Sequence, residues 1–146
     1  MRLRAAAIPP VLLAVVLMAP GGCGAGTTSD TSKFSGTEKD VAQAVYDMRD
    51  AVAKRDENKV CDTYFTPALQ SKLAALAKQD KRGTTCADQL QDSIQDISTT
   101  DITVESVKVS GNDATVTYKT NVPSGTDPVD TLHLTNARGW RLSQLS

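Results

Sequence analysis

The sequence is poor in the residues that build metal and cofactor sites. It contains a single histidine, His133, and three cysteines without Cys-x-x-Cys spacing, so no convincing set of zinc ligands can be assembled. It also lacks a Gly-x-Ser-x-Gly elbow, a phosphate-binding glycine loop and a His-Glu-x-x-His helix. We therefore expect no metal, no nucleotide and no other cofactor.

Clustered positive charge is also missing. The chain has 16 basic and 17 acidic residues, a net charge of −1, and the basic residues do not gather in one stretch. Nucleic-acid binding needs a basic patch, and contact with anionic lipid needs a polybasic segment. Neither partner is expected from the charge pattern.

No apolar run is long enough for a lasting membrane helix. The run from Ala5 to Met18 has about 14 residues, or about 21 Å as a helix, against a hydrocarbon core of roughly 30 Å. It contains Pro9 and Pro10, which weaken a helix, and it follows Arg2 and Arg4. A short basic head, an apolar run and small residues after it predict an export signal over residues 1–22.

Cys23 stands where this signal ends, directly after Gly21 and Gly22. The arrangement resembles a bacterial lipobox, although Pro20 occupies the place of the usual branched apolar residue. The resemblance implies that Cys23 receives diacylglycerol and becomes the mature N-terminus, outside the cell membrane and anchored to it. Two acyl chains suffice for stable anchoring. The alternative is an ordinary exported protein, cleaved nearby, with an incidental cysteine.

The two remaining cysteines, Cys61 and Cys86, form a natural pair outside the cytoplasm. Two thiols in a small exported domain favour a disulfide, and two free buried thiols are the alternative. Closing a loop of about 25 residues would stabilise the domain by roughly 3.5 kcal/mol. The sequence therefore predicts a Cys61–Cys86 bridge.

Residues 23–36 are small and polar, which predicts a flexible tether. Residues 37–146 then suit one folded domain of roughly 110 residues. Four helices are predicted in its first half. The first begins with a capping box at Thr37 and runs for about 17 residues, with Arg49 on its polar face. Its inward residues are Val41, Val45, Met48 and Val52, with Ala44 and Ala51 beside them.

The other three helices each follow a capping residue. They are expected over 57–64 after Asp56, over 67–78 after Thr66, and from 86 to about 97 after Thr85. From residue 102 the apolar residues recur at every second position, as in a strand with one buried face. Strands are predicted over 102–109, with a bulge near Glu105, and over 114–122, 129–134 and 140–142. Helices followed by a strand meander predict an α+β fold, with N-terminal helices packed on an antiparallel sheet of about four strands.

The helical half followed by strands, a turn and Gly139-Trp140-Arg141-Leu142 resembles the NTF2-like α+β superfamily. More narrowly, it resembles small actinobacterial lipoproteins with such a body and a cysteine in each of two N-terminal helices. The resemblance implies a curved sheet wrapped around a helix with a conical cavity between them. Because this superfamily includes enzymes, binding proteins and interaction modules, the fold alone predicts no chemistry.

Few side chains suggest catalysis. Strand alternation places His133 on the open face of the sheet, which lacks the walls that shift a pKa and exclude water. Tyr64, Tyr118 and Trp140 are predicted to face inward, where they line a pocket or simply fill the core. Asp62 is the best candidate for an acid in such a pocket, and the alternative interpretation is that Asp62 is an exposed helix residue.

The first functional hypothesis is non-catalytic. It describes a membrane-anchored lipoprotein that binds a protein, an envelope component or a small apolar ligand. The second is a small pocket enzyme with isomerase- or hydrolase-like acid/base chemistry, using Asp62 with Tyr64 or Tyr118. A weaker third is a homodimer through the polar, threonine-rich open face of the sheet.

Overall fold

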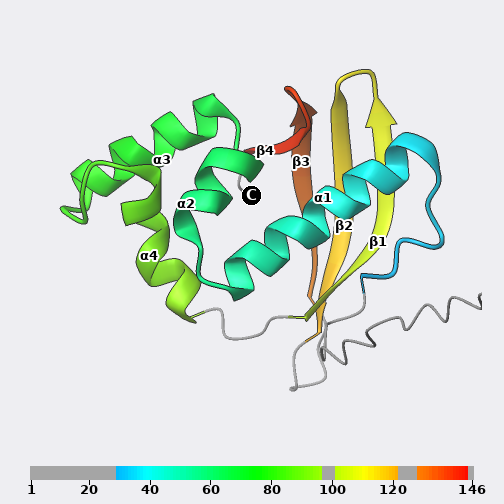
Figure 1. Cartoon of the computed structure of the whole chain (residues 1–146), viewed down its shortest axis with the longest axis horizontal. Helices are drawn as coiled ribbons and strands as arrows, with labels where there is room; N and C mark the ends of the chain where they lie inside the picture. Colours follow the sequence, from blue (N-terminus) through cyan, green and yellow to red (C-terminus); the bar gives the residue numbers. More distant parts are fainter. Residues whose placement is uncertain (1–28, 97–100, 122–127, 145–146) are drawn as a thin grey trace, which may run out of the picture.

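The computed structural model describes residues 29–96, 101–121 and 128–144 (Figure 1). The expected signal and Cys23 lie outside the described residues, as does Ile97. In chain order the elements are α1 (Gly36–Ala53), α2 (Glu57–Lys59), the π-helical turn η1 (Val60–Tyr64), α3 (Pro67–Gln79), α4 (Cys86–Asp96), β1 (Asp101–Ser110), β2 (Asp113–Asn121), β3 (Val129–Asn136) and β4 (Trp140–Gln144).

The α+β prediction is confirmed at the level of helices and a four-stranded antiparallel sheet in the order β1-β2-β3-β4. Among the described helices only α1 crosses a face of the sheet, whereas α2, η1, α3 and α4 form a lobe beside the β4 edge (Figure 1). A parallel bridge joins this lobe to that edge, and the Thr66 N–H donates to the Leu142 carbonyl over 2.9 Å. The lobe therefore covers part of the edge strand.

The predicted bulge is present. The β1–β2 register shifts between Val104 and Ser106, which keeps both Val104 and Val107 on the buried face. The hairpin turn follows at Ser110–Asp113, where Gly111 adopts φ +60°, a conformation that glycine reaches without steric cost.

The core divides into two clusters of buried side chains. The first lies between α1 and the sheet, and the second fills the helical lobe. Members of the first include Val41, Val45, Tyr46, Val104, Val116, Leu134 and Trp140. Members of the second include Ala51, Val60, Cys61, Phe65, Leu69, Leu73, Cys86, Ile94 and Leu142.

Three of the four helix starts are as predicted. Asp56 accepts from the Lys59 N–H at 3.0 Å, and Thr66 accepts from the Leu69 N–H at 3.3 Å. Thr85 and Asp88 cap α4 reciprocally through their side chains and backbone N–H groups, at 3.1 and 2.8 Å. These hydrogen bonds lower the pKa of the Asp88 carboxyl, the Thr85 side chain having the largest effect.

The first helix differs from its prediction. It begins at Gly36 after Ser35, which makes no side-chain capping bond, so the capping box at Thr37 was wrong. Tyr46 and Arg49 are both buried, although the helical pattern assigned Arg49 to the polar face. The reason is local pairing, because the Arg49 guanidinium lies over the Tyr46 ring at 5.1 Å and binds Asp50.

Tyr46 ties α1 to β1 beside the bulge. The backbone N–H of Val104 donates to the Tyr46 hydroxyl over 3.2 Å, and both residues are fully buried. Replacing Tyr46 with Phe removes the acceptor and leaves a buried N–H unpaired, which costs about 1–3 kcal/mol. We expect urea unfolding of Tyr46→Phe to show that loss. The half-buried Tyr64 is the control, and Tyr64→Phe should change the unfolding free energy by less than about 0.5 kcal/mol.

Candidate functional site

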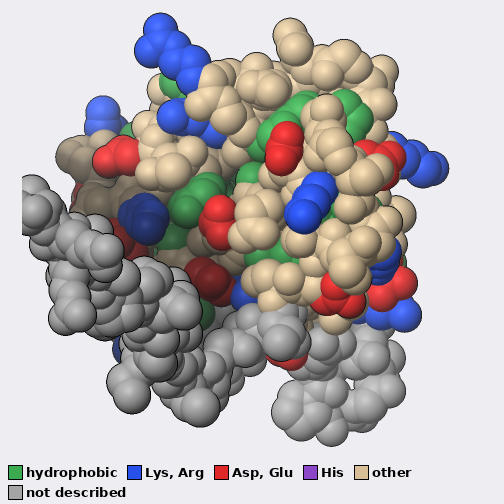
Figure 2. Space-filling model, turned by 45° about the vertical axis from the view of Figure 1, so that its right-hand side comes forward, with side chains coloured by type: hydrophobic (Ala, Val, Ile, Leu, Met, Phe, Trp, Pro, Cys, Tyr) green, Lys and Arg blue, Asp and Glu red, His purple; other side chains and the backbone are tan. Residues whose placement is uncertain are grey.

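A cleft of about 310 Å³ opens between the C-terminal half of α1 and the sheet, at the end of the sheet away from the β1–β2 hairpin. We call it the α1–sheet cleft. Figure 2 shows apolar side chains lying between polar and charged ones on the face of the molecule that it presents. The lining residues of the cleft are Met48, Arg49, Val52, Ile102, Tyr118, Thr120 and Leu132.

The cleft exists because α1 covers the sheet unevenly. Ile102 and Leu132 are half-buried, whereas Val104 and Leu134, two residues further along the same strands, are buried under α1. Met48 and Val52 are likewise half-buried. The apolar stripe of the helix and the inner face of the sheet therefore continue past the packed core into the cleft.

Arg49 forms one wall. Its Nε and Nη2 donate to Asp50 over 3.0 and 2.7 Å, and Nη2 also donates to the Ser29 hydroxyl over 3.3 Å. Nη1 lies 3.7 Å from an Asp101 carboxylate oxygen, is buried, and makes no hydrogen bond within the described residues. The side chain is only 8% exposed, so its positive charge is enclosed by two carboxylates.

Tyr118 supplies a phenol to the opposite wall. Burial raises the pKa of its hydroxyl, and the Asp130 carboxylate, on the paired position of β3, raises it further. A raised pKa keeps the phenol protonated. The protonated hydroxyl can donate or accept a hydrogen bond.

The three aromatic residues predicted to line a pocket are not brought together. Trp140 belongs to the first core cluster, and Tyr64 lines a separate groove with Asp47, Asp50 and Lys54. Burial, followed by the charges of Asp47 and Asp50, raises the pKa of Tyr64. Only Tyr118 lines the α1–sheet cleft.

The two other chemical candidates lie elsewhere. Asp62 is exposed and lines a groove of about 360 Å³ with mixed polar and apolar walls between the helices of the lobe, apart from both tyrosines. His133 is exposed and alternates with Leu132 and Leu134 along β3, which agrees with the predicted open face. No sequence signal singled out the cleft, because its apolar members have the same periodicity as core residues.

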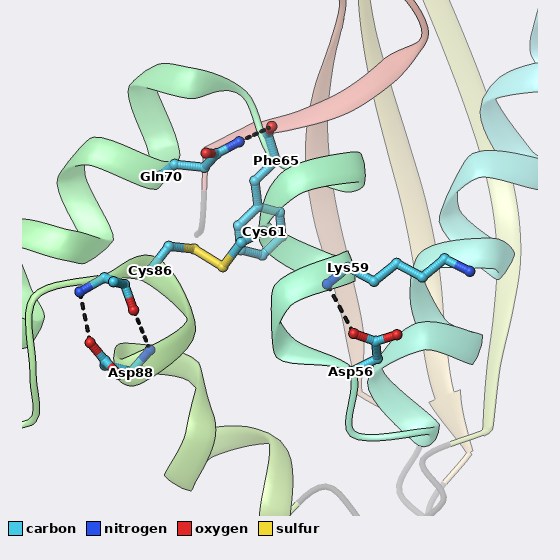
Figure 3. The surroundings of a disulfide bond; sticks show 8 residues. Asp56, Lys59, Cys61, Phe65, Gln70, Cys86 and Asp88 are labelled. Atoms are coloured by element: carbon cyan, nitrogen blue, oxygen red, sulfur yellow. Dashed lines mark hydrogen bonds between the residues drawn. A yellow bond between two sulfur atoms is a disulfide. The ribbon is translucent and has the colours of Figure 1, made fainter.

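The Cys61–Cys86 disulfide is present and joins η1 to α4, with the ring of Phe65 beside it (Figure 3). Both cysteines are buried in the second core cluster, at 3% and 7% exposure. Gln70 closes the turn after η1 by donating to the Phe65 carbonyl over 3.1 Å (Figure 3). The bridge is therefore a structural part of the lobe.

No family model, curated protein or solved structure matches this chain. Within residues 29–96, 101–121 and 128–144, no three His, Cys, Asp or Glu side chains gather as a metal site would require. None of the described helices is long and apolar enough to cross a membrane.

Proposed function

We propose that the protein is an extracytoplasmic lipoprotein, anchored to the cell membrane through lipid on Cys23, whose body is a non-catalytic binding module. Its site is the α1–sheet cleft, and its ligand is a small apolar molecule. Residues 1–22 are the export signal in this proposal, and residues 37–146 form the binding body.

The observation that carries the binding proposal is the apolar lining of an open cleft. Four half-buried apolar side chains surround about 310 Å³, the lower end of the usual range for small-molecule sites, with Tyr118 and Thr120 as the hydroxyl groups. Among the described residues that line the cleft, Arg49 is the one cation, and it is already paired with Asp50 and Asp101. Such a site gains free energy by removing apolar surface from water.

The arrangement favours binding over acid/base chemistry. The enzymatic alternative needs Asp62 beside Tyr64 or Tyr118, and these three residues line three different grooves. The Tyr118 phenol has a raised pKa, so it is protonated at neutral pH and little phenolate is present to accept a proton.

An NTF2-like assignment is part of the proposal. A helix laid across an antiparallel sheet, with a cleft between them, supports it (Figure 1). The outer face of the sheet carries polar residues such as Glu105, Lys119 and His133, and a Lys119–Glu105 ion pair spans 3.7 Å there. A homodimer through this face stays a prediction from the sequence.

Adjacent residues of β2 allow a matched test of the site. Thr120 lines the cleft, and Lys119 alternates onto the other face. An uncharged apolar fluorophore, N-phenyl-1-naphthylamine, should bind the native protein and lose at least tenfold in affinity in Thr120→Trp, because the indole fills the cleft. Lys119→Trp should bind it normally. Equal binding by both variants would contradict the assignment, and far-ultraviolet circular dichroism would confirm that both fold.

A further inference from the structure

Ser29, the first residue that the structure describes, contacts a wall of the cleft. The Ser29 hydroxyl accepts from Arg49, which lines the cleft, and Phe34 packs against the first core cluster. Two backbone bonds, from Thr31 to Ser29 and from Phe34 to Thr31, shape the segment between them. Residues 29–35, which the sequence assigned to the tether, thus lie on the body, and in Figure 1 they run from the lower end of the sheet up beside β1 to the start of α1.

Because of this contact, the free linker between the proposed lipid on Cys23 and the folded body is short. About six peptide units separate Cys23 from Ser29, and fully extended they span at most about 22 Å. A lipid on Cys23 would lie in the outer leaflet. With lipid on Cys23, the linker would keep Ser29, and with it the end of the body that carries the cleft, within about 22 Å of the outer leaflet.

The charge that a ligand meets at the cleft is negative. Asp50 and Asp101 flank the enclosed Arg49 guanidinium and are themselves 47% and 52% exposed. Asp130 is exposed beside Tyr118.

From these observations we infer that the α1–sheet cleft faces the bilayer and takes from it an amphiphile with an apolar body and a positively charged end. This inference rests on the proposed function. The apolar body lies among Met48, Val52, Ile102 and Leu132, and the cation lies near Asp101 and Asp130. A closed apolar cavity of about 150 Å³ accommodates benzene, so an apolar body of about ten non-hydrogen atoms suits this open cleft.

Three probes with one body and different ends test the charge of the ligand. They are 4-phenylbutylamine, 4-phenylbutanol and 5-phenylvalerate, titrated calorimetrically into the full-length Cys23→Ala protein, which carries no lipid at residue 23. The amine should bind about tenfold more tightly than the carboxylate, with the alcohol between them. Equal or tighter binding of the carboxylate would overturn the inference but leave an apolar site. Binding of none of the three would refute the proposed function as well.

The acidic side chains should account for the preference. In Asp101→Asn/Asp130→Asn the amine should lose most of its advantage, to within about threefold of the carboxylate. Asp62→Asn, which removes an exposed carboxylate from the separate groove, should keep the full preference. An unchanged preference in the double variant would show that these carboxylates do not select the ligand.

Photo-cross-linking tests the orientation of the cleft. The photoreactive residue p-benzoylphenylalanine is placed at Val52 in the cleft, or at exposed Lys108 near the hairpin at the other end of β1. With the lipidated protein in phosphatidylcholine vesicles, the Val52 position should cross-link lipid at least fivefold more than the Lys108 position. Greater cross-linking from Lys108 would overturn the orientation. Mass spectrometry of lipid on Cys23 separates that result from a failure of the anchor.

Discussion

Cys23→Ala should release the protein from the membrane fraction. The diacylglycerol proposed for Cys23 supplies two acyl chains, each contributing about 0.8 kcal/mol per buried methylene, and loss of both leaves no other anchor that the sequence identifies. Cell fractionation with immunoblotting should show the native protein almost entirely in the membrane pellet. The variant should move almost entirely to the soluble extracytoplasmic fraction.

Gly22→Ala is the matched control, since it keeps a small residue before the cysteine. It should remain in the membrane pellet, and intact mass should show diacylglycerol on its Cys23. If Cys23→Ala also stays in the pellet with residues 1–22 attached, an uncleaved leader is the anchor and the lipoprotein assignment fails.

Removing the disulfide should produce the largest loss of stability. Cys61 and Cys86 are 25 residues apart, and closing such a loop stabilises the folded state by about 3.5 kcal/mol through the entropy of the unfolded chain. That is a large part of the 5–15 kcal/mol typical of a domain. Urea unfolding of Cys61→Ala/Cys86→Ala should show this loss, and the double variant avoids leaving a free thiol.

Reduction of the native protein provides an independent comparison. Unfolding under dithiothreitol should approach the midpoint of the double variant, whereas Ser71→Ala, in the groove above the bridge, should unfold like the native protein. A loss below about 1 kcal/mol in the double variant would mean that the second core cluster holds the lobe together without the bridge.

The sequence predicted most elements because their signals are local. Asp56, Thr66 and Thr85 cap their helices as expected, since each needs only a backbone N–H two or three residues ahead. The bulge between Val104 and Ser106 was visible as a slip in the alternation of apolar residues. The cysteine pair followed from their number and the expected compartment.

The sequence failed to predict the burial of Arg49 and the position of the cleft, because both depend on contacts between residues far apart in the chain. Arg49 is buried because Asp50, Ser29 and the Tyr46 ring surround it, and helical periodicity carries no information about Ser29. The sequence did not predict the cleft for a related reason. Whether Met48 or Ile102 is buried or half-buried depends on how far α1 extends over the sheet, which spacing along the chain does not specify.

Methyl-resolved NMR gives the most direct test that the α1–sheet cleft is the binding site. On titration with 4-phenylbutylamine, the methyl signals of Ile102, Leu132 and Val52 should shift together and saturate. Those of Leu73 and Ile94, buried in the second core cluster, should stay in place. Shifts confined to residues around the disulfide groove, such as Ala74 and Ala87, or no saturable shift at all, would contradict the assignment.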